Sequence, residues 1–243
     1  MSSTVLIDYG SGNLRSAEKA LIRAARDLPG SAEVVTTSEP DIIATAERLV
    51  LPGVGAFAAC MSAITSRPGL QEALEETVRR RGRPFLGVCV GMQLMAARGL
   101  EFGETPGFGW IDGEVRRLEP SELSSPERLK VPHMGWNSLE EVGGCPVFAG
   151  LEGRDMYFTH SFAFYPSDAA DVAAWTTHGE RFAAAFTDQP STAPLRSTTC
   201  SHSKPSAANR LAWSAGEALN TVTWSMSPCS RRTHWPSFRS MAG

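Results

Sequence analysis

The chain has 243 residues, a 42% share of hydrophobic residues and a formal net charge of −3 at pH 7, values that allow one large globular domain or two small ones. This near-neutral balance argues against nucleic acid or an anionic membrane as the main partner, and no apolar run is long enough to span a bilayer. The five cysteines are scattered without a Cys-x-x-Cys pair, which favours a reducing cytoplasm over a disulfide framework or a zinc site.

Short apolar segments alternate with helical periodicity through the first hundred residues. This alternation predicts parallel βαβ units. Strands are expected at residues 5–7, 34–35, 49–51 and 85–88, and helices at residues 14–24, 70–78 and 91–97.

After Gly107 the pattern changes to short strands and turns, which predicts an antiparallel extension of the same sheet. The expected strands lie at residues 113–115, 136–139, 156–164, 172–175 and 182–186. Residues 1–186 are therefore interpreted as one α/β domain with a mostly parallel sheet.

Residues 187–243 differ in composition from this domain. They contain 11 serines and six basic residues against two acidic ones, whereas the first 186 residues carry 17 basic and 24 acidic residues. Two interpretations stay open: a disordered basic tail, or translation in a wrong reading frame.

Residues 84–93 contain the most informative motif, Gly87-Val88-Cys89-Val90-Gly91. An apolar strand leads directly into a cysteine with glycine two positions before and after it, and a helix is expected to follow. This is the pattern of a nucleophile elbow with cysteine in place of serine. A helix N-terminus favours the thiolate, and the Val90 N–H is expected to face a developing oxyanion. The simpler alternative is a buried core cysteine.

Residues 51–57 form a second glycine-rich turn after a strand, Leu-Pro-Gly-Val-Gly-Ala-Phe. Such a backbone can offer N–H groups to negative charge. Because glycine-rich turns are common, Gly53 and Val54 are predicted as oxyanion donors only in combination with the cysteine elbow.

Together the two segments resemble the class I glutamine amidotransferases, and three further motifs resemble the histidine-pathway glutaminase, a subunit of imidazole glycerol phosphate synthase. These motifs are Asp-Tyr-Gly-Ser-Gly-Asn at residues 8–13, Pro-His-Met-Gly-Trp-Asn at residues 132–137 and Tyr-Phe-Thr-His-Ser at residues 157–161. They occur in the family's order, and the resemblance covers residues 4–186.

The resemblance implies a flavodoxin-like sheet and a glutaminase that forms a heterodimer with a (β/α)₈ cyclase subunit. Ammonia released at Cys89 would pass to the cyclase, which would make imidazole glycerol phosphate. The family uses no metal and no organic cofactor.

The resemblance also implies roles for individual residues. Cys89 would form a thioester with the glutamine side chain, and the oxyanion would be stabilised by Val90 and the Gly53–Val54 turn. Gln93 would hold the α-amino and carboxylate end of glutamine together with His160 and Ser161, although Gln93 could also be a solvated helix residue and His160 a core histidine. The face toward the cyclase would comprise Asn13, Pro132, His133, Met134 and Trp136.

The general base is the weakest part of the resemblance. The family supplies it from a His-Pro-Glu segment near the C-terminus, and the nearest equivalent here is His202-Ser203-Lys204. Lys204 stands where a carboxylate is wanted, and a lysine cannot accept the imidazole N–H. His202 follows Cys89 in the expected order and is the candidate base. The alternative is a solvated histidine in an irregular segment.

Four other functions are compatible with parts of the sequence. A chain that binds the cyclase without hydrolysing glutamine is favoured by the missing carboxylate. An amidotransferase for another synthase and a cysteine hydrolase without glutamine fit the motifs less well. A dinucleotide site at residues 10–13 lacks its third glycine, because position 15 is Arg15.

Overall fold

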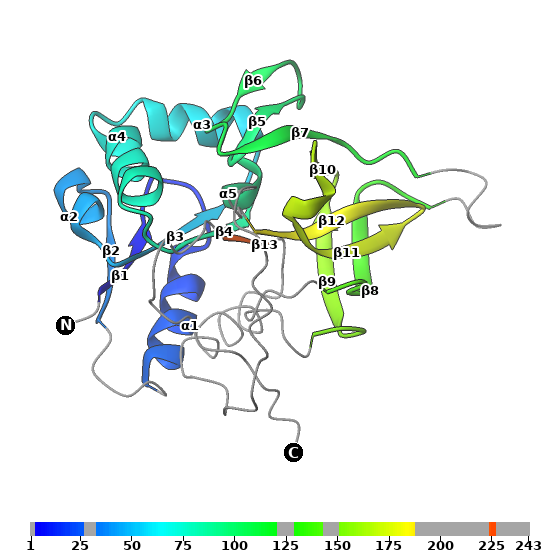
Figure 1. The fold of residues 1–243 in the computed structure, drawn as a ribbon, viewed down its shortest axis with the longest axis horizontal. Coiled ribbons are helices and arrows are strands. Elements are labelled where there is room, and N and C mark those ends of the chain that lie inside the picture. The colour runs from blue at the N-terminus through cyan, green and yellow to red at the C-terminus, as the bar shows by residue number, and fades with distance from the viewer. Residues whose placement is uncertain (1–2, 27–32, 121–128, 143–150, 188–223, 227–243) are drawn as a thin grey trace.

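The computed structural model describes residues 3–26, 33–120, 129–142, 151–187 and 224–226, the last of these for the backbone alone. Helices cover the parallel half of a central sheet, and a strand-rich part lies beside it (Figure 1). Within the described ranges no helix is long and apolar enough to cross a membrane.

Four strands form the parallel half of the seven-stranded central sheet. β1 (Ser3–Ile7) pairs with β2 (Glu33–Thr37) and with β3 (Arg48–Gly53), and β3 pairs with β4 (Phe85–Cys89). Parallel neighbours need crossover connections. These contain α1 (Leu14–Arg26), α2 (Pro40–Thr45), α3 (Phe57–Thr65), α4 (Leu70–Glu75) and the π-helical turn η1 (Glu76–Arg80), while α5 (Val90–Gln93) follows β4. The predicted βαβ alternation is confirmed.

The strands of this half face two cores because side chains alternate along a strand. In β1, Leu6 packs with Leu21 of α1 on one face of the sheet. Val5 and Ile7 point to the other face, where they join Ile43 of α2 and the buried side chains of α3 and α4. With both faces covered, the carboxyl ends of the strands are where an open parallel sheet offers a crevice.

The antiparallel half of the same sheet contains β11 (Val172–His178) and β12 (Glu180–Thr187), as predicted. Between β12 and β4 lies β13 (Trp224–Met226), which runs parallel to β12 and antiparallel to β4. No strand was predicted in residues 187–243, so β13 is an addition to the predicted fold. It pairs with β4 over residues 86–88, directly before Cys89.

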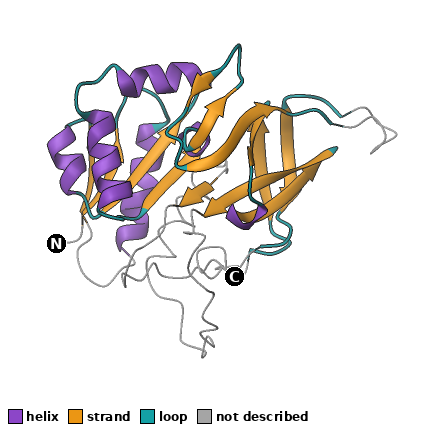
Figure 2. Cartoon of the chain, turned by 45° about the horizontal axis from the view of Figure 1, so that its top comes forward, coloured by secondary structure: helices purple, strands orange, loops and turns teal. Residues whose placement is uncertain are grey.

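The remaining strands form two smaller sheets, whereas one continuous extension was predicted. One contains β5 (Ala96–Gly99), β6 (Thr105–Pro106), β7 (Ile111–Arg117) and β10 (Phe162–Pro166), and the other contains β8 (His133–Ser138) and β9 (Asp155–His160). Figure 2 shows this strand-rich part beside the helices. A short 3₁₀ turn, η4 (Ala169–Asp171), precedes β11.

Two local predictions were wrong in their extent. The helix expected at residues 91–97 ends at Gln93, because Ala96 begins β5 and its carbonyl accepts the Gly109 N–H at 3.0 Å. The strand expected at residues 156–164 divides at Ser161 into β9 and β10, which join different sheets. In both cases pairing between distant segments overrides the local apolar pattern.

Candidate active site

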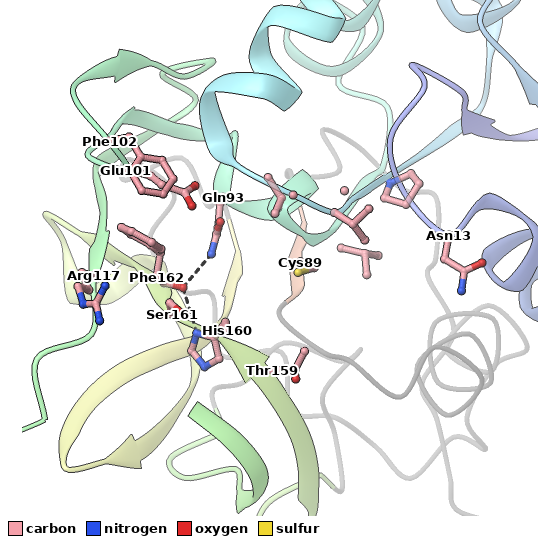
Figure 3. Close-up of a pocket in the computed structure, with 16 residues that line it drawn as sticks. Asn13, Cys89, Gln93, Glu101, Phe102, Arg117, Thr159, His160, Ser161 and Phe162 are labelled. Carbon is pink, nitrogen blue, oxygen red and sulfur yellow. Dashed lines mark hydrogen bonds between the residues drawn. The ribbon is translucent and has the colours of Figure 1, made fainter. Parts of the chain in front are cut away.

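Cys89 lies at the sharp turn from β4 into α5. Its φ of 56° and ψ of −120° are rarely adopted by residues other than glycine. The strained strand-to-helix elbow predicted from the sequence is therefore present. Cys89 is one of the residues that line a cavity, and the close-up in Figure 3 shows its sulfur among them.

Glycines hold the elbow by direct contact between backbone segments. A Cβ at Gly91 would lie 2.0 Å from the carbonyl oxygen of Leu51, and a Cβ at Gly87 would lie 2.6 Å from the Cα of Met92. A Cβ at Gly53 would lie 2.5 Å from the Gly91 nitrogen. Since such separations are far below van der Waals contact, the β3 turn and the elbow approach each other only because these three residues lack side chains.

The Cys89 thiol is buried enough that desolvation raises its pKa, and a smaller electrostatic contribution from Cys60 raises it further. The Val90 backbone N–H opposes both by lowering the pKa. Because α5 has only four residues, its dipole is small. The predicted bias toward the thiolate is therefore outweighed by burial, and the thiol needs a base when it reacts.

The Val54 N–H, predicted as an oxyanion donor, is engaged by a hydroxyl from the β1–α1 loop. It donates to the Ser11 Oγ at 3.2 Å, and the Ser11 hydroxyl donates to the Val54 carbonyl at 2.6 Å. The Cys60 thiol donates to the same carbonyl at 3.5 Å. For Val54 to donate to charge at Cys89, its N–H would have to leave Ser11.

A cavity of about 590 Å³ opens beside Cys89 and brings together the predicted nucleophile, oxyanion and substrate residues. Asn13, which was predicted to face a partner, also lines it. The full lining consists of Asn13, Pro52, Gly53, Val54, Gly55, Val88, Cys89, Val90, Gln93, Glu101, Phe102, Arg117, Thr159, His160, Ser161 and Phe162.

One backbone carbonyl fixes two of the predicted substrate residues (Figure 3). The Phe162 oxygen accepts from Gln93 Nε2 at 3.0 Å and lies 3.0 Å from His160 Nδ1. Gln93 is only 6% exposed, so this contact sets the orientation of its side-chain amide. The amide oxygen is then the atom that can accept a hydrogen bond from a ligand. Burial lowers the pKa of His160 to about 4, although the bond to Phe162 opposes the shift.

The cavity contains two charged residues that the sequence did not single out. Glu101, in the β5–β6 connection, accepts the Phe57 N–H at 2.8 Å with its Oε2. Arg117 ends β7, and both side chains line the cavity, as does the 92% exposed Phe102. No motif marks these positions, since Glu101 lies in a connection between strands and Arg117 reaches the cavity through the pairing of β7 with β10.

Only some of the residues predicted to face the partner lie on the surface. Met134 and Trp136 are each 65% exposed, and the Trp136 ring packs edge-on against Tyr157. Pro132 is also exposed. His133, however, is 1% exposed, so its prediction as a face residue is corrected: it points inward because neighbours along a strand alternate in direction.

The candidate base, His202, and Lys204 lie outside the described residues. Within the described ranges no hydrogen bond joins an imidazole to Cys89, because both ring nitrogens of His160 contact Phe162 and His133 instead. No group of three or more His, Cys, Asp or Glu side chains in these ranges is arranged to hold a metal ion.

Comparison with known proteins agrees with this geometry. The family model "Glutamine amidotransferase class-I" matches residues 5–193. The protein "Imidazole glycerol phosphate synthase subunit HisH" of Caulobacter vibrioides is 51% identical over 186 residues, which are 76% of this chain and 85% of that protein. Its namesake in Cereibacter sphaeroides is 53% identical over 72% of this chain and 81% of that protein. The chain therefore belongs to the class I glutamine amidotransferases, within the HisH family of imidazole glycerol phosphate synthase subunits.

Proposed function

We propose that the chain hydrolyses glutamine to glutamate and ammonia with Cys89 as the nucleophile. The carrying observation is the strained elbow that presents the Cys89 sulfur to the cavity, which the Gly53–Val54 turn also lines. The sulfur adds to the side-chain amide carbon, ammonia leaves from the resulting oxyanion, and water releases glutamate from the thioester. Val90 and Gly53 donate to the oxyanion, and Val54 joins them once its N–H leaves Ser11.

The far end of glutamine is bound by the opposite wall of the cavity. Gln93 and the His160–Ser161 segment lie there with one carboxylate and one guanidinium. Glutamine carries an ammonium and a carboxylate on its α-carbon, so Glu101 suits the first and Arg117 suits the second.

His202 is the proposed base, and Lys204 in the place of an orienting carboxylate would weaken it. A second candidate function follows: a chain that binds its partner but hydrolyses glutamine poorly. The raised pKa of Cys89 favours this alternative, because a protonated thiol without an oriented base attacks slowly.

The partner proposed is a (β/α)₈ cyclase subunit in the cytoplasm, which would use the ammonia to make imidazole glycerol phosphate. Support comes from the relatives, which are named as subunits of that synthase. The exposed Met134 and Trp136 offer an apolar contact surface, and Pro132, which is also exposed, precedes them in the chain. Asn13 lines the cavity and is proposed to face the partner from there.

Glutamate release measures this function directly. The full chain is assayed with glutamine alone, then with the cyclase subunit and its nucleotide, beside the Cys89→Ala variant. The proposal expects release that rises with the partner and is lost in the variant. Equal release by both proteins would show that Cys89 is not the nucleophile. Partner binding without any release would support the non-catalytic alternative.

A further inference from the structure

Three histidines from three strands meet behind the cavity. His133 Nδ1 on β8 lies 3.2 Å from His160 Nε2 on β9. The His178 ring on β11 stacks on the His133 ring with 3.9 Å between centroids. The outer nitrogens of the first two rings end on oxygens: His160 Nδ1 is 3.0 Å from the Phe162 carbonyl, and His133 Nε2 is 2.9 Å from Asn137 Oδ1.

The direction of the Asn137 amide is set by its other neighbour. Asn137 Nδ2 lies 2.5 Å from the Thr177 carbonyl oxygen, and a carbonyl can only accept. The amide must therefore turn its N–H groups to Thr177 and its oxygen to His133. Both ends of the histidine chain are consequently acceptors.

This arrangement needs one proton more than two neutral histidines carry. The outer nitrogens of His133 and His160 must each hold a proton to donate to an oxygen, and the inner contact needs a third proton between the rings. Two neutral imidazoles carry only two protons on their four nitrogens. In the neutral pair, two lone pairs must therefore face each other at one of the three contacts.

The surroundings of the pair resist a charge. Phe158 stacks on His133 with centroids 5.2 Å apart, and Phe182 of β12 packs edge-on against His160 at 4.9 Å. Burial lowers the pKa of both histidines. The extra proton is therefore absent at neutral pH and enters on acidification.

Among the titratable groups around the pair, His178 acts on both rings. His178 lowers the pKa of both His133 and His160, while its own Nε2 donates to the Lys130 carbonyl at 3.0 Å. The carboxylate of Glu140 accepts from the Thr177 hydroxyl at 3.4 Å, so it is bound to β11 and not to an imidazole.

We propose that His133 and His160 bind a single shared proton as one unit, and that this unit positions the Phe162 carbonyl and, through it, Gln93. When the proton enters, all three contacts are made at once, and His160 holds the carbonyl that orients Gln93. His133 is then a positioning residue for glutamine, although it lies outside the lining of the cavity. This last step rests on the proposed function.

Proton uptake can be followed without any activity. The full chain is labelled with ¹⁵N-histidine, and imidazole shifts are recorded from pH 8 to about pH 3, below the His160 pKa of about 4, with single His→Asn variants for assignment. The expected result is one joint step in which both rings change together and gain one proton in total. Two independent steps at ordinary histidine pKa values would overturn the shared proton.

Two variants sharpen this test. In His133→Asn the new amide can donate permanently to His160 Nε2, so His160 should stay neutral through the pH of the joint step. His178→Asn, the matched control, keeps the chain of contacts and removes a like charge, so the joint step should persist and move to higher pH. A His160 titration unchanged by His133→Asn would contradict the proposal.

The link to glutamine is measured by binding. Calorimetry on the Cys89→Ala protein, which cannot turn over, gives the Kd for glutamine above and below the joint step. The Kd should fall roughly three- to tenfold on protonation, the effect of one hydrogen bond. It should be flat when His133→Asn is added. Parallel pH curves in the two proteins would overturn the positioning role, and absent glutaminase activity would sink the proposed function alone.

Discussion

The Cys89 sulfur is placed by backbone packing, because the residues around it are glycines in contact with peptide groups. Gly53, Gly87 and Gly91 each have main-chain atoms where a Cβ would be. The nucleophile therefore depends on contacts that no side-chain rearrangement can relieve. Its neighbours across the cavity, Gln93 and Glu101, are held in a different way, through hydrogen bonds to the backbone.

Gly91→Ala should destabilise the fold by about 3 kcal/mol or more, because its Cβ would meet the Leu51 carbonyl at 2.0 Å. Gly135→Ala is the matched control, since nothing lies within 4 Å of a Cβ there, and reduced freedom of the unfolded chain should leave its stability unchanged or raise it slightly. Urea unfolding of both variants gives the comparison. Equal midpoints would show that the elbow can relax.

The residues of the site differ in how far the sequence reveals them. Cys89 and its flanking glycines form a local pattern with one physical purpose, so they could be predicted. Glu101 and Arg117 could not, because the β5–β6 connection brings the first to the cavity and the pairing of β7 with β10 brings the second. The inward direction of His133 was available from the period of two along β8, which places it opposite Met134 and Trp136.

The paired strands β8 and β9 carry both an exposed apolar face and a buried histidine pair. Met134 and Trp136 lie on one side of β8, and His133 on the other. A ligand on the face and a proton in the pair would therefore act on the same two strands.

Stability should fall on acidification through His160. Its pKa is about 4 when folded, against an ordinary value of 6.5. Above pH 6.5 both states are neutral, and between the two values the unfolded chain binds a proton that the folded chain does not. The free energy of unfolding should therefore drop as pH falls from 6.5 to 4, by at most about 3 kcal/mol.

Chemical unfolding at several pH values measures this slope. The His160→Asn variant, which cannot titrate at this position, should show a shallower dependence over the same range. An identical slope in the variant would assign the acid sensitivity to other groups.

Docking of the proposed cyclase subunit should depend on Trp136, which is 65% exposed and braced by Tyr157. Trp136→Ala should weaken the complex by about tenfold or more, as expected for an aromatic anchor. Ile22→Ala, at a 38% exposed position on α1, is the control and should bind normally. Calorimetric titration compares them, and equal loss in both would remove β8 from the interface.

The elements were predictable where their pattern is local. The β1 to β4 alternation was confirmed because buried parallel strands are continuous apolar runs between helical segments. The helix after Cys89 was predicted too long, since Ala96 to Gly99 pair with β7. Apolar residues there serve a strand as well as a helix, and only the distant partner decides between them.

At the scale of the molecule the chain has two parts, of which only the first resembles known proteins over its whole length. The family model matches residues 5–193, and the relative from Caulobacter vibrioides aligns with 76% of the chain. This match does not test the proposal that residues 187–243 are frame-shifted or irregular. The pairing of the β13 backbone with β4 and β12 does not test it either.

The coding DNA beyond the Phe186 codon decides between the two interpretations of this segment. If another frame encodes an apolar strand that ends in His-x-Glu, the intact protein has a complete cysteine, histidine and glutamate triad. We expect this outcome because the composition changes abruptly at residue 187. If all three frames lack that pattern, the segment is native and the non-catalytic alternative gains support.

The left-handed conformation of Cys89 lowers the stability of the fold while it supplies the proposed catalytic sulfur. A φ of 56° suits glycine far better than cysteine, so Cys89→Gly should raise the melting temperature by several degrees, equivalent to about 1 kcal/mol, while removing the sulfur. Laboratory evolution that rewards only expression and heat tolerance should therefore accumulate glycine at this codon early. A library screened for histidine-independent growth should instead retain cysteine, and the population would record which of the two pressures it had experienced.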